Sequence, residues 1–296
     1  MTEIINNPSV KHDALFLFDV MDSNPNGDPD NAGKPRTDLD TGQGLASDVS
    51  LKRKIRDSVA FQVDQGLLSA DRFGIFIRRG ESLNKQLLDA YNAVGQKPSD
   101  KPTSQEEAIA AEYMIKHFFD VRMFGAVMST GEKGKKASAG KVTGPVTVGI
   151  ARSVDPVMPM DMGITRVAST KEEDRDNASQ MGNKTVIPYG LYAARIHYQP
   201  TRNCLVTEDD MVVLWKTLKM MFEWTRSSAR PDLNVRGIFV FSHDNALGNA
   251  PAHTLFEMVS VFKVDGIEIP RSFADYIISE PDSENPFEGV TYSRLV

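Results

Sequence analysis

Short apolar runs alternate along the chain with segments in which apolar residues recur at helical spacing. The runs have the length of buried strands, which we predict at residues 14–20, 73–77, 142–150, 189–198 and 238–241. The helical spacing predicts helices at residues 48–64, 82–93 and 105–120, and a further helix that begins after Thr207. Since an amphipathic helix buries one face, these segments predict a packed core of strands and helices.

Two of the predicted helices have clear start signals. Ser47 is a good N-cap for the first helix, and Asp48 is placed favourably against the helix dipole. Thr207 has Asp210 three residues later, in the capping-box position. One face of that last helix carries large apolar residues, namely Met211, Leu214, Trp215, Leu218, Met221 and Phe222. This face predicts core packing rather than a cofactor site.

Three segments lack such a pattern. Residues 22–46 are rich in Asn, Asp, Gly and Pro, and loops of this length inside compact domains usually have a function or are disordered. Residues 130–141 combine glycines with lysines and predict a mobile basic loop. Residues 155–187 mix Pro, Met, Asp and Lys without a clear period, so we expect an excursion from the core.

When the insertions are left out, the predicted order is strand, helix, strand, strand, helix, strand. This order is the split βαβ pattern of ferredoxin-like folds, which RNA-recognition domains use. The strand at residues 189–198 is additional to that pattern. We therefore predict an α+β fold with a ferredoxin-like core.

The composition agrees with a folded protein. The chain has 296 residues, of which 41% are apolar and 25% are charged, and this excludes a mainly disordered chain. Cys204 is the single cysteine, which excludes a disulfide framework and a zinc site made of cysteine pairs. The sequence shows no signal-peptide pattern, and no apolar stretch reaches the ~18 residues of a membrane span. We therefore expect a soluble, cytoplasmic protein without membrane contact.

Charge is unevenly distributed along the chain. The net charge of −6 argues against a free-standing nucleic-acid-binding protein. Residues 122–152, however, contain six basic residues and one acidic residue, and residues 265–296 contain seven acidic and two basic residues. This asymmetry is typical of a protein with one basic working face, or of copies that contact each other through opposite charges. Two solvated loops would explain it equally well.

The chain lacks the motifs of several common sites. Seven aspartates lie between Asp19 and Asp48, but a calcium loop that starts at Asp22 would have Gly33 where a bidentate Glu is required. Neither a phosphate-binding Gly-rich loop nor a Gly-x-Ser-x-Gly sequence occurs. The five histidines are scattered singly, without metal-ligand spacing. We therefore expect no catalytic constellation, no metal and no cofactor.

One basic cluster directly follows the long polar loop. Lys52, Arg53, Lys54 and Arg56 crowd the start of the first predicted helix. Basic side chains at a helix start, next to a loop with free backbone amides, can bind consecutive phosphates. A solvated helix face has the same pattern, so the cluster alone leaves both interpretations open.

Taken together, several segments resemble the backbone subunit of the CRISPR type I-C surveillance complex (Cascade), of the Cas-seven branch of the RAMP superfamily. The matching motifs follow the family's order over about residues 12–245. They are Phe18-Asp-Val, Asn24-Pro-Asn-Gly-Asp-Pro-Asp30, Pro35-Arg36-Thr-Asp38, Ser47-Asp-Val-Ser-Leu-Lys-Arg-Lys-Ile-Arg-Asp57, Arg122-Met-Phe-Gly125, Gly144-Pro145-Val, Ile164-Thr-Arg166 and Gly182-Asn-Lys-Thr-Val-Ile-Pro-Tyr-Gly-Leu-Tyr192. Several long, unusual motifs in one order make the resemblance specific, whereas the acidic C-terminal segment carries none.

The resemblance implies a non-catalytic protomer that binds CRISPR RNA. Copies of such proteins assemble head to tail along the guide spacer and present its bases for pairing with target DNA in antiviral defence. Such a heterologous interface builds a helical filament. The other implied partners are the remaining Cascade subunits, namely the guide-processing subunit, the large subunit and the small subunits.

Two rival interpretations remain at this stage. Some RAMP relatives cleave RNA, which makes a metal-dependent RNA endonuclease the chief alternative, with Asp28, Asp30, Asp38 and Asp40 as its candidate residues. A filament protein that binds no nucleic acid is the third interpretation. Guide RNA of defined length should co-purify only with the first kind of protein.

The resemblance also implies a division of the chain. The ferredoxin-like palm, which would bind the guide, corresponds to residues 12–80, 121–154 and 188–250. Residues 81–120 would form a helical finger insertion and residues 155–187 a projecting thumb. Residues 251–296 would form an acidic C-terminal segment.

We expect RNA contacts from basic and amide side chains of these regions, namely Asn24, Asn26, Arg36, Lys52, Arg53, Arg56, Arg122, Lys141, Arg166 and Lys184. A second expectation concerns Met158, Met160 and Met162, whose spacing of two places them on one side of an extended segment. Flexible methionines on a projecting hairpin would form a wedge against an unstacked base. The alternative is a hydrophobic cluster inside one protomer.

Overall fold

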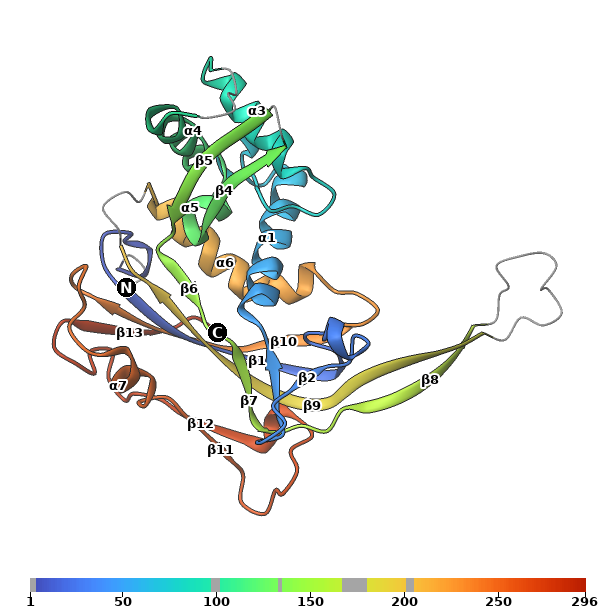
Figure 1. Cartoon of the computed structure of the whole chain (residues 1–296). Helices are drawn as coiled ribbons and strands as arrows, with labels where there is room; N and C mark the ends of the chain where they lie inside the picture. Colours follow the sequence, from blue (N-terminus) through green and yellow to red (C-terminus); the bar gives the residue numbers. More distant parts are fainter. Residues whose placement is uncertain (1–3, 97–101, 133–134, 167–179, 201–204) are drawn as a thin grey trace.

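The computed structural model describes residues 4–96, 102–132, 135–166, 180–200 and 205–296. Figure 1 shows a central sheet with its helices, a helical part at the top of the view, and a long two-stranded hairpin that projects to one side. The described part of the chain begins with a short 3-10 helix, η1 (Ile4–Asn6). No helix within these residues is long and apolar enough to cross a membrane.

The central sheet has nine strands in the order β13-β10-β1-β9-β7-β3-β2, with β6 and β8 also paired to β9. The strands are β1 (His12–Ser23), β2 (Arg36–Thr37), β3 (Gln43–Ala46), β6 (Val146–Val148), β7 (Ala151–Pro156), β8 (Met160–Arg166), β9 (Gln180–Tyr198), β10 (Asp232–His243) and β13 (Val290–Arg294). All of these pairs are antiparallel. In the middle of the sheet, His12 pairs with Tyr198 on one side and with Ser242 on the other.

Successive residues of β1 point to opposite faces of this sheet. Phe16 and Phe18 pack in the core beneath α1 (Asp48–Asp64) and α6 (Glu208–Trp224). Leu17 lies on the other face, in a second core that the C-terminal segment completes. Because both faces are covered, β1 is a continuous apolar run in the sequence rather than an alternating one.

The two helices on the sheet begin where the sequence predicts. Ser47 accepts the backbone N–H of Ser50 at 3.2 Å, so α1 begins at Asp48. Thr207 and Asp210 form a capping box at the start of α6. Both start predictions are confirmed, because each depends on a few neighbouring residues.

The acidic C-terminal segment is an integral part of the fold. It contains α7 (Ala252–Phe256), β11 (Ser260–Lys263), the 3-10 helix η4 (Phe273–Asp275) and β12 (Tyr276–Ser279), and it ends in β13. Leu255 and Phe256 pack with Leu17 and Phe241 in the second core. The segment therefore covers β1 and β10 on the face opposite α1 and α6.

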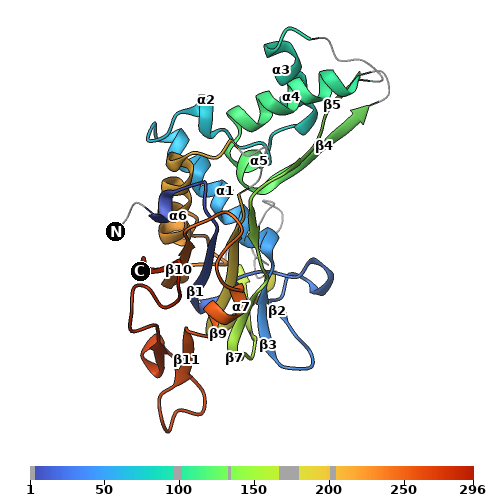
Figure 2. The ribbon, with the colours of Figure 1, turned by 90° about the vertical axis from the view of Figure 1, so that its left-hand side faces the viewer.

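The helical part comprises residues 70–143. It contains α2 (Ala70–Phe73), α3 (Leu83–Ala93), α4 (Ser104–His117), α5 (Phe119–Phe124) and the ribbon of β4 (Gly125–Glu132) and β5 (Lys135–Thr143). Leu87, Tyr91, Met114 and Ala139 contribute to a core of its own. Figure 2 shows the ribbon extending away from the sheet beside α3 and α4.

The ribbon leaves the sheet where two glycine backbones meet. Gly125 has a φ of +73°, which side chains rarely adopt, and a β-carbon at Gly144 would lie 2.4 Å from the Gly125 nitrogen. No side chain fits at that distance. This contact explains the glycines of the two sequence motifs that end at Gly125 and begin at Gly144.

Two of the predicted elements are wrong. Residues 73–77 form no strand, because α2 ends at Phe73 and Asp120 accepts the backbone N–H groups of the next turn. Residues 130–141 were expected to be a loop, but those that the structure describes belong to β4 and β5. Ala137 and Ala139 are buried in this ribbon, and residues this small give no hydrophobic pattern to detect.

Three other predicted segments differ in detail. The strand expected at residues 142–150 is interrupted at Gly144 and Pro145, so that β5 ends before it and β6 follows it. The long loop of residues 22–46 contains the 3-10 helix η2 (Pro29–Asn31) and the small strands β2 and β3. The excursion at 155–187 contains the hairpin of β8 and β9, while its residues 167–179 lie outside the described part.

Candidate nucleic-acid interface

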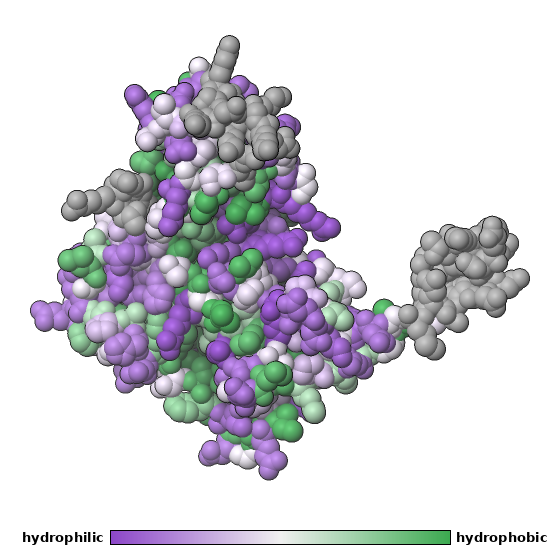
Figure 3. Space-filling view, in the orientation of Figure 1, coloured by the Kyte–Doolittle hydropathy of each residue, from purple (hydrophilic) through white to green (hydrophobic). Residues whose placement is uncertain are grey.

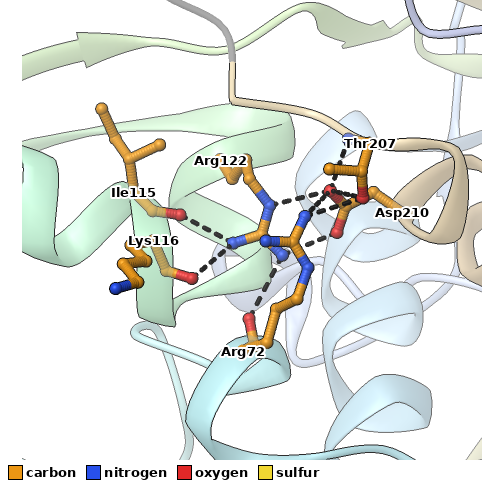
Figure 4. A network of polar contacts seen from close by, with 6 residues as sticks. All are labelled: Arg72, Ile115, Lys116, Arg122, Thr207 and Asp210. Carbon is orange, nitrogen blue, oxygen red and sulfur yellow. Dashed lines mark hydrogen bonds and ion pairs between the residues drawn. The ribbon is translucent and has the colours of Figure 1, made fainter.

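Arg122 is fully buried where the helical part meets α6 (Figure 4). Its Nη2 and Nε donate to the two carboxylate oxygens of Asp210 at 2.6 and 3.0 Å. Its Nη1 donates to the carbonyls of Ile115 and Lys116, and Arg72 donates to the same Asp210 carboxylate. A buried bidentate pair with these additional hydrogen bonds has a structural role.

Arg56 is engaged in the same way. Its Nε donates to Oδ2 of the buried Asp120 at 2.8 Å, and its guanidinium lies 5.3 Å from the centre of the Phe124 ring. The sequence predicts RNA contacts for both Arg56 and Arg122. In the structure both side chains instead join the helical part to the rest of the protein, so neither belongs to the interface considered below.

Asn24 and Asn26 shape the loop between β1 and α1. Asn24 Nδ2 donates to the carbonyl of Gly33, and Asn26 Oδ1 accepts the backbone N–H of Ser47, both at 2.8 Å. The backbone N–H of Asn24 donates to the carbonyl of Ala229, which fixes the loop against the turn after α6. The side chains and backbone of these two residues therefore hold three segments together: the loop, the start of α1 and the turn.

Four cations surround this junction and are called the cationic surface here: Arg36, Lys52, Arg53 and Arg230. Lys52 lies 3.0 Å from Asp48 within α1. Arg53, which is 59% exposed, lies 3.4 Å from Asp57. Such i,i+4 pairs at a surface contribute only about 0.3–0.5 kcal/mol. Lys52 and Arg53 can therefore exchange their carboxylates for phosphates at little cost.

Arg230 was not predicted as a site residue, because no sequence motif marks it. Its Nε is buried without a hydrogen-bond partner, and the described residues provide no carboxylate for its guanidinium. The neighbouring Lys54 is only 7% exposed, and its Nζ donates to the carbonyl and hydroxyl of Thr225. Burial, followed by the nearby charge of Arg230, lowers the pKa of Lys54 to about 8. A tertiary contact brings Arg230 beside α1, so no local pattern marks it.

The hairpin carries two of the three predicted methionines, Met160 and Met162, and Met158 lies just before it. Figure 3 shows the hairpin as a narrow arm that leaves the body. Met158 is 85% exposed, Met160 43% and Met162 45%. Met160 and Met162 lie in β8, opposite Val186 and Lys184 of β9. Exposure of this extent is not expected for a hydrophobic cluster inside one protomer.

The remaining predicted residues are not all brought together. Lys34 of the loop lies 2.8 Å from Asp161 of β8, so Lys184 and the hairpin root adjoin the loop. Lys141 is exposed on β5 in the helical part, apart from the cationic surface. The backbone of Arg166 pairs with that of Gln180 at the far end of the hairpin, and its side chain lies outside the described part.

The aspartates of the loop also have defined partners. Asp28 lies 3.2 Å from Arg36, and Asp38 lies 2.7 Å from Arg152. The hydrogen bond from Arg152 lowers the pKa of Asp38. Across the described ranges, no group of three or more histidine, cysteine or carboxylate side chains is placed to hold a metal ion.

A separate polar cluster is buried at the beginning of β1. The His12 ring donates from Nε2 to the carbonyl of Asn7 and accepts from the Ser242 hydroxyl, each at 2.9 Å. Burial lowers the pKa of His12 to about 4. Although burial raises the pKa of Asp13, hydrogen bonds from His197, His243 and Lys11 hold it below its usual range.

Comparison with known protein families gives a match over most of the chain. The family model described as CRISPR-associated protein Cas7 matches residues 10–280. A CRISPR-associated protein Cas7 of Haloferax volcanii is 28% identical over 195 residues. That alignment covers 62% of this chain and 54% of the relative, so the chain spans about half of the relative's length.

Comparison with solved structures gives matches to chains of CRISPR complexes. A chain of a CRISPR RNA-guided surveillance complex has a TM-score of 0.46 and 14% identity, over 87% of this chain and 78% of that one. A chain of a second such complex, in a pre-nicking state, has a TM-score of 0.43 and 16% identity, over 78% of each chain. A chain of a type III-B Cmr-beta complex bound to cognate target RNA has a TM-score of 0.40 and 10% identity, over 78% of this chain and 61% of that one.

Proposed function

Because the chain belongs to the CRISPR-associated protein Cas7 family, we propose that it is a guide-RNA-binding backbone protomer of a CRISPR surveillance complex. Copies of the chain assemble head to tail along the guide RNA, and together they present its bases to target DNA. A heterologous interface that does not close on itself produces such a filament.

The observation that carries this proposal is the cationic surface. Arg53 is largely exposed with a weak partner, and Arg230 has no carboxylate partner in the described part of the chain. In a protein of net charge −6, cations kept together at one junction favour a binding partner with negative charge. Phosphates of an RNA backbone fit, because they need charge and hydrogen-bond donors but no base-specific groups.

We assign the parts of the protomer accordingly. The order β10-β1-β9-β7, with α1 after β1 and α6 after β9, supports a ferredoxin-like palm. The finger insertion predicted at residues 81–120 lies within the helical part, and we extend it to α5, β4 and β5, which share the core of that part. The hairpin of β8 and β9 is the thumb. The exposed Met158, Met160 and Met162 are the apolar wedge of that thumb, which packs against an unstacked base of the guide.

The proposed role is binding without catalysis. The endonuclease alternative would use Asp28, Asp30, Asp38 or Asp40, and of these Asp28 and Asp38 have an arginine partner. A cleavage assay with labelled RNA and a divalent metal tests all four directly. Intact RNA after prolonged incubation is the expected result, and short products that disappear on mutation of any of the four aspartates would support the nuclease instead.

The resemblance further supports a type I-C complex with its guide-processing, large and small subunits, located in the cytoplasm. Native mass measurement of the complex purified through this chain, with sequencing of its RNA, gives the subunit set and the copy number. Several copies of this chain on one RNA of defined length are the expected result. One copy without RNA contradicts the proposal.

The central test is the double substitution Arg53→Ala and Arg230→Ala. The matched control is Lys216→Ala with Lys219→Ala, which removes two exposed charges from α6. The first variant should lose RNA affinity equally for all sequences. Its log-affinity against log-salt slope should fall by about 1.4, since each phosphate contact with a single strand contributes about 0.7. The control variant should keep the salt slope of the unaltered protein. If Arg53→Ala with Arg230→Ala lost affinity only for certain RNA sequences and kept its salt slope, the assignment of phosphate contacts would be falsified.

A further inference from the structure

The face of the sheet opposite α1 and α6 holds a pocket of about 550 Å³. Leu15, Leu17 and Ala193 line its sheet side, and Arg152 and Arg195 also line it. Ala193 pairs with Leu17 on β1 and with Arg152 on β7, and Arg195 pairs with Leu15. Directly paired residues of an antiparallel sheet point to the same side, so both arginines stand over one apolar floor.

The pocket exists because the C-terminal segment covers only part of this face. The segment packs on β1 and β10, and Phe256 of α7 forms the boundary of the pocket. The part over β9 and β7 stays open. RNA-recognition domains of the split βαβ type bind single strands on this same face of the sheet. Here the covered half excludes a ligand, and the open half has room for one.

Arg195 is free to take up an anion, and Arg152 can exchange an exposed carboxylate partner for one. The guanidinium of Arg195 lies 5.3 Å from the centre of the Phe256 ring and has no carboxylate partner among the described residues. Its outer side is exposed. Arg152 is half exposed and forms an ion pair with Asp38 at 2.7 Å. His197, further along β9, and Lys11, just before β1, are already engaged with the buried Asp13. Among these four side chains, Arg195 alone has no carboxylate partner in the described part of the chain.

We propose that this pocket binds one nucleotide of a single-stranded nucleic acid, at a contact separate from the cationic surface. The base stacks on the outer side of the Arg195 guanidinium, which Phe256 supports from below. The phosphate pairs with Arg152, and the sugar rests on the apolar floor. A planar cation beside an apolar floor and a second cation fits a nucleotide better than an acidic peptide, whose carboxylates offer no planar apolar surface.

The test uses the protein as purified, with its bound RNA identified by sequencing. A fluorescent seven-nucleotide RNA without complementarity to that RNA is added, and its binding is measured by anisotropy. Arg195→Gln is compared with Lys216→Gln, an equal charge change on the exposed side of α6. Arg195→Gln should weaken binding about ten-fold, the effect of losing one stacked base. Lys216→Gln should leave it unchanged, and a heptaglutamate peptide should not compete.

Photocrosslinking of the same oligonucleotide with 4-thiouridine locates the site. Crosslinks to peptides around Arg195 and Phe256 support the pocket. Crosslinks only to α1 and the loop of residues 22–46, equal binding by both variants, or displacement by heptaglutamate overturns it. The amount of RNA that co-purifies with Arg195→Gln distinguishes the two sites. Arg195→Gln should retain as much co-purified RNA as the unaltered protein even if it no longer binds the oligonucleotide. The variant with Arg53→Ala and Arg230→Ala should instead lose the co-purified RNA.

Discussion

The helical part and the hairpin both extend from the central sheet, but different contacts hold them. The helical part is fixed through the buried pair of Arg122 and Asp210, which also receives Arg72. The hairpin is attached by the backbone of β9, which continues from the sheet, and by the exposed pair of Lys34 and Asp161. Both regions therefore have an ion pair where they join the sheet. The pair of the helical part is buried, and that of the hairpin is exposed.

The difference in environment determines how freely each region can move. Removing one partner of a buried pair leaves an uncompensated charge, so the pair holds a single geometry. An exposed pair contributes at most about 1 kcal/mol and can be replaced by water. The helical part is thus held in one orientation. The hairpin can change its angle at low cost, which suits an element that adjusts to a neighbouring copy or to a nucleic acid.

The largest effect on either region is expected for Arg122→Met, in the helical part. The substitution leaves the Asp210 carboxylate buried without its bidentate partner, which should lower the free energy of unfolding by about 3–5 kcal/mol. Urea unfolding followed by circular dichroism measures the loss. Arg53→Met is the matched control and should change the value by less than about 0.5 kcal/mol. A loss below about 1 kcal/mol for Arg122→Met would show that the buried pair does not fix the helical part.

A lower pH should destabilise the sheet, where His12 is buried, and should leave the pair of Lys34 and Asp161 at the hairpin intact. His12 has a pKa of about 4 in the folded protein, against 6.5 in the unfolded chain. The unfolded chain therefore binds the proton first as the pH falls. Stability should decrease between about pH 6.5 and 4, by about 3 kcal/mol in total. His12→Gln should flatten this part of the profile, and an equally steep profile in that variant would refute the assignment.

The methionine wedge offers a change confined to the hairpin. Substituting Met158, Met160 and Met162 by Ser should change the thermal midpoint of the protomer by no more than a few degrees, because these side chains are exposed. Assembly on RNA, measured by native mass, should be weakened. A protomer that loses much stability alone would instead favour a hydrophobic cluster within one copy. Substituting the buried Met114, Met123 and Met128 by Ser is the matched control, for which a large loss is expected.

The smallest effect is expected for Lys34→Ala. Its pair with Asp161 is exposed on both sides, so unfolding free energy should change by about 0.2–1 kcal/mol. Hydrogen exchange of the β8 and β9 amides should nevertheless become faster, since the root of the hairpin loses its side-chain contact. Exchange in the helical part serves as the internal control and should not change. Equal acceleration in both parts would remove the distinction between them.

Local signals explain which elements could be predicted from the sequence. The starts of α1 and α6 follow from Ser47 and from the pair of Thr207 and Asp210, which act over a few residues. The strands β1, β9 and β10 follow from long apolar runs. The ribbon of β4 and β5 was missed, because Ala137 and Ala139 are buried against α3 and α4 without being strongly hydrophobic.

The candidate site could be predicted less well, since charge alone does not distinguish a buried cation from an exposed one. Arg53 and Arg56 lie three residues apart on the same helix. Arg53 is exposed, whereas Arg56 meets Asp120, which is 64 residues away in the chain. Arg230 lies still further away in the chain, yet its charge acts on Lys54 of α1. Such partners are set by the tertiary fold, so the sequence pattern alone could not show that Arg56 and Arg122 are buried in ion pairs.

The position of β1 has a consequence for how the protein is made. β1 is synthesised first among the sheet strands, but its partners are residues 180–198 and 232–243. At typical translation rates, roughly 10 to 35 s pass before the nearer partner follows it from the ribosome. Meanwhile an apolar strand has two unpaired edges, a state prone to pairing with other chains. The yield of folded protein therefore depends on protection of the nascent chain as well as on the stability of the finished sheet.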